Sequence, residues 1–182
     1  MPADRLRSAL RDSTSPLHKN LDEVVGDFGS EKGYMAYVRR THRFRHTIES
    51  AINEDDAGGW ALDRIANLAS MDIADLGIDV MPERELNVSF DCPARRLGAS
   101  YVLEGSSLGA RLLLRRAEAL GMTADLGARH LARQASDPRR WRMFLTVLEQ
   151  LPEDKHEAAL AAARDTFRLA LSIYSETAHE FA

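Results

Sequence analysis

The sequence contains a single cysteine, Cys92, among its 182 residues. One thiol cannot form an intrachain disulfide, and it cannot supply the cysteine ligands of a structural zinc site. The chain also lacks an apolar run long enough for a membrane-spanning helix, and its first residues, MPADRLRSALRDSTS, are too polar for a secretory signal. We therefore expect a cytoplasmic protein that is not embedded in a membrane.

Neither sign of charge is in large excess. Lysine and arginine number 24, and aspartate and glutamate number 28, which gives a formal net charge of −4 and a pI near 5.9. A large nucleic-acid-binding surface is therefore not expected. The short basic clusters, such as Arg39-Arg40 and Arg115-Arg116, are typical of solvated helix faces, although one of them could bind a small anionic ligand.

Helical periodicity dominates the sequence, and no repeat or long linker divides it. In the stretch 31–52, four apolar residues fall on one helical stripe, namely Tyr34, Val38, Ile48 and Ile52. Further helical patterns occur at 58–78, 93–121, 124–136, 139–151 and 152–181, most of them beside a proline or glycine. Residues 79–93 are less regular, and LNVSF (86–90) is their only strand-like run. The sequence thus predicts one all-α, multi-helical domain over residues 1–182.

The N-terminal segment carries a candidate metal ligand. Ser15 and Pro16 are typical of an N-cap and a first helical position, so they predict that a helix restarts there. His18 follows, and Asp22 lies four residues later, where it can accept a hydrogen bond from one ring nitrogen and leave the other for a metal. The alternative for His18 is an ordinary surface or hydrogen-bonded core histidine. Arg11 shares the face of His18 only if Pro16 does not interrupt the helix.

The segment YVLEGSSLGARLLLRR (101–116) reads as one helix with two interior glycines, Gly105 and Gly109. Each costs about 1 kcal/mol of helix stability relative to alanine, and their i, i+4 spacing puts them on one face. One interpretation is close packing against another helix. The other is that a flat ligand lies against the exposed backbone and that the helix bends there.

Two Glu-x-x-His pairs, Glu153 with His156 and Glu176 with His179, have the spacing found in di-iron bundles. Both lie close to a predicted helix end and not in a helix middle, so we interpret them as chance surface pairs. Cys92 is interpreted as a half-buried small residue in preference to a reactive thiol.

These segments resemble the bacterial, biliverdin-producing haem oxygenases over nearly the whole chain. LRSALRDSTSPLHKNLD (6–22) is similar to the family's proximal segment, and YVLEGSSLGARLLLRR to its distal helix. RRWRMFLTVLEQ (139–150) and AAARDTFRLAL (161–171) are similar to its closing helices. The resemblance implies a haem-oxygenase-like fold in which haem lies between a proximal and a distal helix.

The resemblance also assigns roles on the proximal side. His18 matches the ligand of the haem iron, and Asp22 matches the acidic residue that orients the imidazole. Arg11 and Arg142 fall near positions where the family has basic residues for the haem propionates. Pro16 implies that the proximal helix starts later than is usual in the family. This affects the match of Arg11 to a propionate-binding position more than it affects the other matches.

On the distal side, Gly105 and Gly109 match the glycines that let the helix kink and its backbone approach the haem, leaving room for dioxygen and an ordered water. Ser106 stands where many mammalian-type members have an aspartate that organises this water, so the water must be held differently. Ala110 replaces the second glycine of the family's GG form, which implies a smaller kink. We count Gly105, Ser106 and Gly109 as the catalytic stretch.

The resemblance implies an enzyme that cleaves haem to biliverdin, carbon monoxide and iron, with haem as both cofactor and substrate. No flavin or nicotinamide motif is visible, so the electrons would come from a ferredoxin or a flavoprotein reductase, and a phytochrome is a candidate acceptor of the bilin. The alternative is a non-catalytic haem-binding or haem-sensing protein. A third hypothesis is a helical enzyme without haem that uses Cys92 or the Glu-x-x-His pairs.

Overall fold

The computed structural model describes residues 3–52, 58–82, 86 and 88–176. Within this part of the chain, all regular structure is helical: α1 (Ala3–Val25), α2 (Glu31–Ala51), α3 (Ala66–Asp75), α4 (Pro93–Ala119), α5 (Arg129–Ala135), α6 (Arg140–Leu148), a 3₁₀ turn (Glu153–Lys155) and α7 (His156–Tyr174). The predicted all-α class is confirmed. The described residues of the strand-like run, 86 and 88–90, form no strand.

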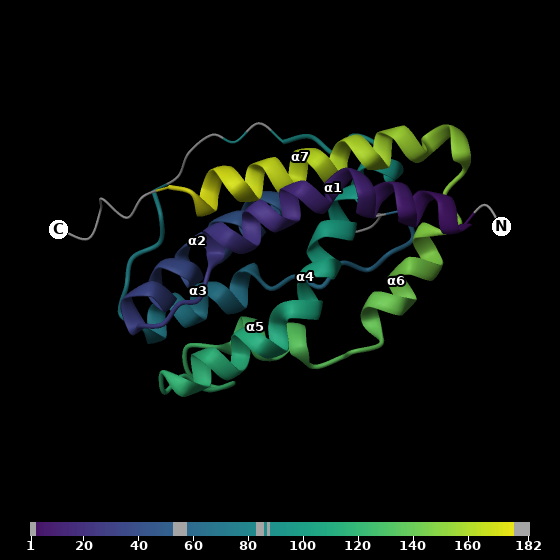
Figure 1. Cartoon of the computed structure of the whole chain (residues 1–182). Coiled ribbons are helices and arrows are strands. Elements are labelled where there is room, and N and C mark those ends of the chain that lie inside the picture. Colours follow the sequence, from purple (N-terminus) through teal and green to yellow (C-terminus); the bar gives the residue numbers. More distant parts are fainter. Residues whose placement is uncertain (1–2, 53–57, 83–85, 87, 177–182) are drawn as a thin grey trace.

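The helices are arranged around α7 and α4. Figure 1 shows α1 lying along α7, and α4 descending from these two helices toward α5 at the lower left. α2 packs against α3 and also contacts α7, while α6 packs against α4. α4 thereby links the α1–α7 layer to the short helices α5 and α6.

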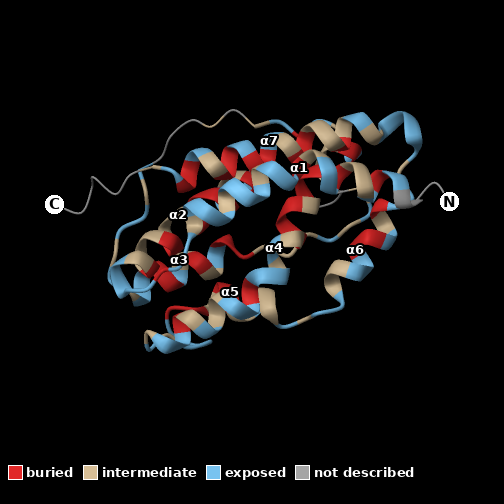
Figure 2. Ribbon diagram, viewed as in Figure 1, coloured by how far each residue is buried: buried red, intermediate tan, exposed pale blue. Residues whose placement is uncertain are grey.

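Two apolar clusters hold this arrangement. In the first, the predicted stripe of α2 is fully buried: Tyr34, Val38, Ile48 and Ile52 are each at most 1% exposed. The second joins α1, α4, α6 and α7 through Leu10, Leu97, Phe144 and Phe167, among others. Figure 2 shows the buried residues in stripes along the helices, with exposed residues on their outer faces. Burial of this apolar area is the main favourable term for folding.

The predicted restart of a helix at Ser15 is wrong, because α1 runs without interruption through Pro16. Proline removes one backbone N–H from the helix ladder, but the packing of α1 outweighs this loss. Leu6 and Leu10 are almost fully buried on one side of the proline, and Leu17 packs against the same cluster on the other side. Arg11 and His18 therefore lie two turns apart on one continuous helix.

The helical pattern at 58–78 is only partly confirmed, since α3 begins at Ala66. The carboxylate of Glu49 in α2 accepts hydrogen bonds from the backbone N–H groups of Ile65 and Ala66, at 3.0 and 3.1 Å. A side chain of another helix therefore supplies the N-terminal cap that the local sequence lacks. The patterns at 93–121 and 139–151 correspond to α4 and α6, and α7 ends at Tyr174.

Candidate functional site

His18 lies on the exposed face of α1 and is paired with Asp22 as the spacing predicts. Nδ1 of His18 is 2.9 Å from Oδ2 of Asp22, and both side chains are more than half exposed. The imidazole also packs edge-on against Phe167 of α7, with ring centroids 5.8 Å apart. The carboxylate and the phenylalanine fix the ring orientation, and Nε2 has no partner among the described residues. A ring held in this way can ligate a metal through Nε2.

α1 and α4 meet one turn before His18. Tyr101 of α4 lies beside Thr14 of α1, and its burial between the helices raises the pKa of the phenol, although the nearby Thr14 hydroxyl partly offsets this. Thr14 precedes His18 by four residues, and Tyr101 precedes Gly105 by four, so His18 and Gly105 each lie one helical turn beyond this contact. Figure 1 shows the two helices diverging, with α1 continuing along α7 while α4 descends.

Close packing does not account for the two glycines of the 101–116 segment. A Cβ added to Gly109 would have nothing within 4 Å, and one added to Gly105 would make only ordinary contact with the ring of Trp141, at 3.7 Å. α4 is helical from Pro93 to Ala119, and its path changes direction in Figure 1. None of the described residues packs tightly against either glycine, which favours the interpretation that they leave space for a ligand.

The glycine that serves packing is Gly98, which the sequence analysis did not single out. A Cβ on Gly98 would overlap the backbone of Ala159 in α7. The sequence feature that indicates this contact is the alanine-rich run of α7 at 158–163, because small residues on both helices allow their backbones to approach closely.

Ser106 and Ser107 both bond to the backbone of their own helix. The hydroxyl of Ser106 donates to the carbonyl of Leu103, and that of Ser107 donates to the carbonyl of Glu104, each at 2.6 Å. Ser106 has one further partner, since Nε2 of Gln134 in α5 donates to its Oγ at 2.9 Å. Gln134 was not expected to touch this stretch.

Glu104 is a second residue that the sequence analysis missed. Although it is charged, it is 3% exposed, and its carboxylate accepts two hydrogen bonds from Arg140, at 2.8 and 2.9 Å. The indole N–H of Trp60 donates to the same carboxylate at 2.9 Å, and the guanidinium of Arg140 lies over the Trp60 ring. A buried ion pair with this geometry fixes α4 against α6 directly before Gly105. The sequence feature that indicates a buried charge here is a glutamate that directly follows three apolar residues, Tyr101, Val102 and Leu103.

The two predicted anion-binding arginines both lie on the surface. Arg11 is exposed and bonds to its neighbour Asp12, and it is close enough to Tyr101 to lower the pKa of the phenol. Arg142 is exposed on α6 and has no ion-pair partner among the described residues. No contact in this part of the chain links Arg142 to His18 or to the α4 glycines.

The alternative metal and thiol sites gain no support. Nε2 of His156 bonds to the carbonyl of Leu151, and the described residues contain no group of three potential metal-ligating side chains. Glu176 pairs with Arg43, and His179 lies outside the described residues. Cys92 is half-buried directly before α4.

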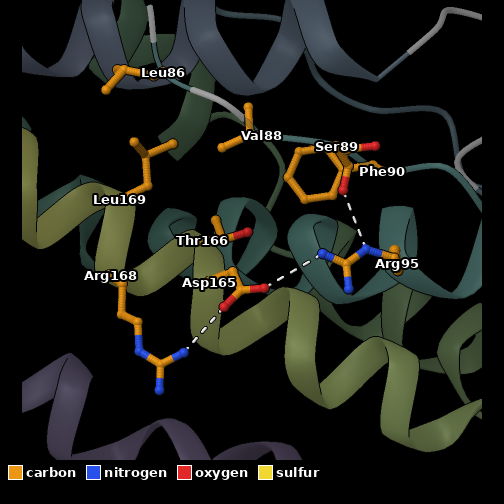
Figure 3. A pocket seen from close by; sticks show the side chains of 9 residues that line it. All are labelled: Leu86, Val88, Ser89, Phe90, Arg95, Asp165, Thr166, Arg168 and Leu169. Atoms are coloured by element: carbon orange, nitrogen blue, oxygen red, sulfur yellow. Dashed lines mark hydrogen bonds and ion pairs between the residues drawn. The ribbon is translucent and has the colours of Figure 1, made fainter.

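A pocket of about 310 Å³ lies away from these residues. Figure 3 shows Asp165 of α7 between two arginines, to which it is paired at 3.4 Å (Arg95) and 3.1 Å (Arg168). The remaining lining residues are Leu86, Val88, Ser89, Phe90, Thr166 and Leu169. The charges of this pocket are already paired, and none of the predicted site residues lines it.

Comparisons with known proteins agree on one family. A family model described as heme oxygenase matches residues 80–176. Heme oxygenase PigA of Pseudomonas aeruginosa is 32% identical over 169 residues, which cover 85% of this chain and 83% of that protein. A crystal structure of NO- and CO-bound heme oxygenase from Neisseria meningitidis has a similar fold, with a TM-score of 0.75, 24% identity, and coverage of 94% of this chain and 90% of the other.

Proposed function

Because this chain belongs to the heme oxygenase family, we propose that it cleaves haem oxidatively to biliverdin, carbon monoxide and iron. Haem is both the cofactor and the substrate, dioxygen is the oxidant, and electrons come from a ferredoxin or a flavoprotein reductase. The observation that carries the proposal is the relation between His18 and the α4 glycines. An oriented imidazole, His18, and the first of two glycines on one face of α4, Gly105, each lie one turn beyond the contact of Thr14 with Tyr101.

The residues of this region fit a haem group. His18 would hold the haem iron through Nε2, since Nδ1 is paired with Asp22. The open space at the Cβ position of Gly109 is suited to a flat ring lying against the backbone. Large apolar side chains are exposed nearby in sequence: Leu108 and Leu112 on α4 are 64% and 53% exposed. Exposed apolar side chains beside a candidate site are consistent with a hydrophobic ligand that covers them.

Bound haem supplies the redox chemistry of dioxygen, and the protein residues orient and shield it. His18 would hold the iron as a neutral imidazole, because Asp22 keeps the ring proton on Nδ1 and leaves Nε2 available. Gly105 and Gly109 would keep their part of α4 free of side chains beside the haem, which would leave room for dioxygen and an ordered water. Ser106, directly after Gly105, would contribute its hydroxyl oxygen as a hydrogen-bonding group beside this space. Arg11 and Arg142 are suited to pair with the propionates at the solvent edge.

The setting of the reaction is part of the same proposal. The described part of the chain contains no helix that is long and apolar enough to cross a membrane. We infer a cytoplasmic enzyme whose electron donor is a separate protein. A bilin-binding phytochrome is a candidate acceptor of the product, and transfer of the purified product to apo-phytochrome, followed by its absorption spectrum, tests that role.

The first experiment separates haem binding from turnover. Titration of the purified chain with haemin is expected to give a sharp Soret band, which His18→Ala abolishes or strongly weakens. His46→Ala is the matched control, because His46 is also exposed but lies on α2. Ascorbate or a reductase in air should then convert the bound haem to a bilin, identified by absorption and mass. Binding without any bilin would contradict the enzymatic function, and a Soret band unaffected by His18→Ala would contradict the assigned ligand.

A further inference from the structure

The hydrogen bonds around Ser106 have only one consistent direction. Oγ of Ser106 is 2.6 Å from the carbonyl oxygen of Leu103, which can only accept, so the hydroxyl proton points there. Oγ must then accept from Gln134, which requires the amide nitrogen of Gln134 to face it, at 2.9 Å. The serine has therefore committed its donor and one lone pair, and one lone pair of Oγ remains. Ser106 can offer this site only as an acceptor, in a fixed direction.

Gln134 can define this direction because α5 is itself firmly held. The carboxylate of Asp72 in α3 accepts the backbone N–H groups of Arg129 and His130, at 2.9 and 3.0 Å. It also pairs with Nδ1 of His130 at 2.7 Å, and both side chains are fully buried. A side chain of α3 thus caps the first turn of α5. Gln134 lies four residues after His130, one turn further along the same helix.

A seven-residue helix has little stability of its own, so its position depends on such tertiary anchors. The neighbouring residue Arg133 adds an ion pair from α5 to Asp63, at 2.9 Å. Through its hydrogen bond to Ser106, Gln134 connects the anchored helix α5 to the catalytic stretch of α4. The neighbouring serine of α4, Ser107, is outside the catalytic set and has no such partner among the described residues.

We propose that Gln134 is a positioning residue for the distal face of the haem site, acting through Ser106. This inference rests on the proposed function. By holding the Ser106 hydroxyl on the Leu103 carbonyl, Gln134 keeps one oxygen lone pair of Ser106 directed to the side of α4 where water and dioxygen are to be held. An amide and a serine from two helices would then do the work for which a single aspartate is expected in the mammalian-type sequences.

The test is a double-mutant cycle between Gln134→Leu and Ser106→Ala. The readout is the pH midpoint at which the visible spectrum of the ferric haem complex changes. A fixed hydrogen-bond acceptor favours the protonated form of a water molecule that donates to it. Each single variant is therefore expected to lower this midpoint by roughly 0.5–1 pH unit. In the double variant, Gln134→Leu should cause no additional shift. Ser107→Ala is the matched control, and its midpoint should equal that of the unmodified protein.

Several outcomes would overturn the inference. An unchanged midpoint in Gln134→Leu would do so, and so would equal shifts for this variant with and without Ser106, since Gln134 would then act by another route. Gln134→Asn, which is one methylene too short to reach Ser106, provides a second variant if leucine disturbs folding, and the same shift is expected. An intact, His18-dependent Soret band with an unmoved midpoint contradicts only this inference, whereas failure of the unmodified chain to bind haem contradicts the proposed function.

Discussion

Gly98 of α4 and Ala159 of α7 lie against each other so closely that no side chain fits between them. The ideal Cβ position of Gly98 overlaps the backbone carbonyl of Ala159, which cannot turn aside as a flexible side chain would. α4 and α7 form one of the main helix contacts of the molecule. The backbone approach at Gly98 therefore sets how α4 sits on the α1–α7 layer.

Gly98→Ala should be strongly destabilising. Alanine gains about 1 kcal/mol in helix propensity, but the overlap is with backbone and forces α4 away from α7, so we take the upper end of the overpacking cost, about 3 kcal/mol. We expect a net loss of about 2 kcal/mol in the free energy of unfolding, measured by urea denaturation followed by circular dichroism. A variant as stable as the unmodified chain would contradict the close packing.

Gly109→Ala should have the opposite effect on the haem-free protein. Since its Cβ would meet nothing within 4 Å, the helix propensity of alanine should raise the free energy of unfolding by up to about 1 kcal/mol. The same methyl group should weaken haem binding, because it enters the space proposed for the ring. The comparison of urea denaturation with haemin titration checks both parts. Loss of stability without haem would show that Gly109 serves packing.

The contrast between these glycines shows what the sequence could predict. His18 with Asp22, and Gly105 with Gly109, are relations within one helix, and the 3.6-residue period places such pairs without knowledge of the fold. The importance of Gly98 depends on which helices cross there, and neighbouring residues do not encode that. The prediction at Pro16 is wrong for a related reason, because leucines on both sides of it pack against one apolar cluster and outweigh its local preference.

Local sequence also does not show which residues of other helices contact the catalytic stretch. Gln134 and Arg140 reach α4 from other helices, and nothing in their local sequence distinguishes them from ordinary surface residues. The all-helical class and the position of α4 follow from periodicity, proline and glycine. The cap on α3 and the cap on α5 do not, because each is made by a carboxylate of a different helix.

Removing only one partner of the Glu104–Arg140 ion pair should lower the free energy of unfolding more than replacing both partners does. Glu104→Ala leaves a largely buried guanidinium beside Trp60 without its carboxylate, at a cost of about 3 kcal/mol in the free energy of unfolding. Replacing both residues, as in Glu104→Leu with Arg140→Met, should recover most of this loss, since an apolar pair needs no charge compensation. Urea denaturation of the three variants measures the effect.

The exposed pair of Lys155 with Asp154 is the control for this comparison. Lys155→Ala removes an ion pair in which both side chains are more than half exposed, and it should cost less than about 1 kcal/mol. If the double replacement at Glu104 and Arg140 were no more stable than Glu104→Ala alone, the view that an unpaired buried charge causes the loss would be wrong.

Asp72 should make the protein sensitive to acid. Burial raises the pKa of its carboxyl, but hydrogen bonds from the ring and backbone of His130 and the backbone of Arg129 outweigh this and hold the pKa below 3.8. Because the folded-state pKa is depressed, the stabilisation is present above the unfolded-state value near 3.8 and is lost as the pH falls through the folded-state pKa. The free energy of unfolding should therefore decrease below about pH 4.

Asp72→Asn tests this assignment. The neutral amide cannot bind the imidazole and the two backbone N–H groups as a carboxylate does, so the variant should be less stable at neutral pH and should show a smaller further loss in acid. Asp12→Asn, at an exposed position, is the control and should leave the acid profile unchanged. An acid profile of Asp72→Asn that parallels that of the unmodified chain would assign the acid sensitivity to other groups.

The four tyrosines should remain protonated in the folded chain well above the usual phenol pKa. Burial is the main cause in every case: it raises the pKa of Tyr174 to about 12, and it also raises the pKa values of Tyr34, Tyr37 and Tyr101. A raised folded-state pKa means that the stabilisation is complete below the unfolded-state value of 10 and is lost as the pH rises through the folded-state values.

An alkaline titration should therefore show little phenolate absorbance until the helices unfold, with circular dichroism and ultraviolet absorbance changing together. Tyr101 is the least buried of the four and should ionise first, so Tyr101→Phe should remove the earliest part of the absorbance change. Because Tyr101 packs in the cluster that joins α1 to α4, and its hydroxyl lies beside Thr14, this variant should also loosen the contact of α1 with α4 and weaken haem binding. A phenolate signal at the ordinary phenol pKa with the helices intact would contradict the burial of these side chains.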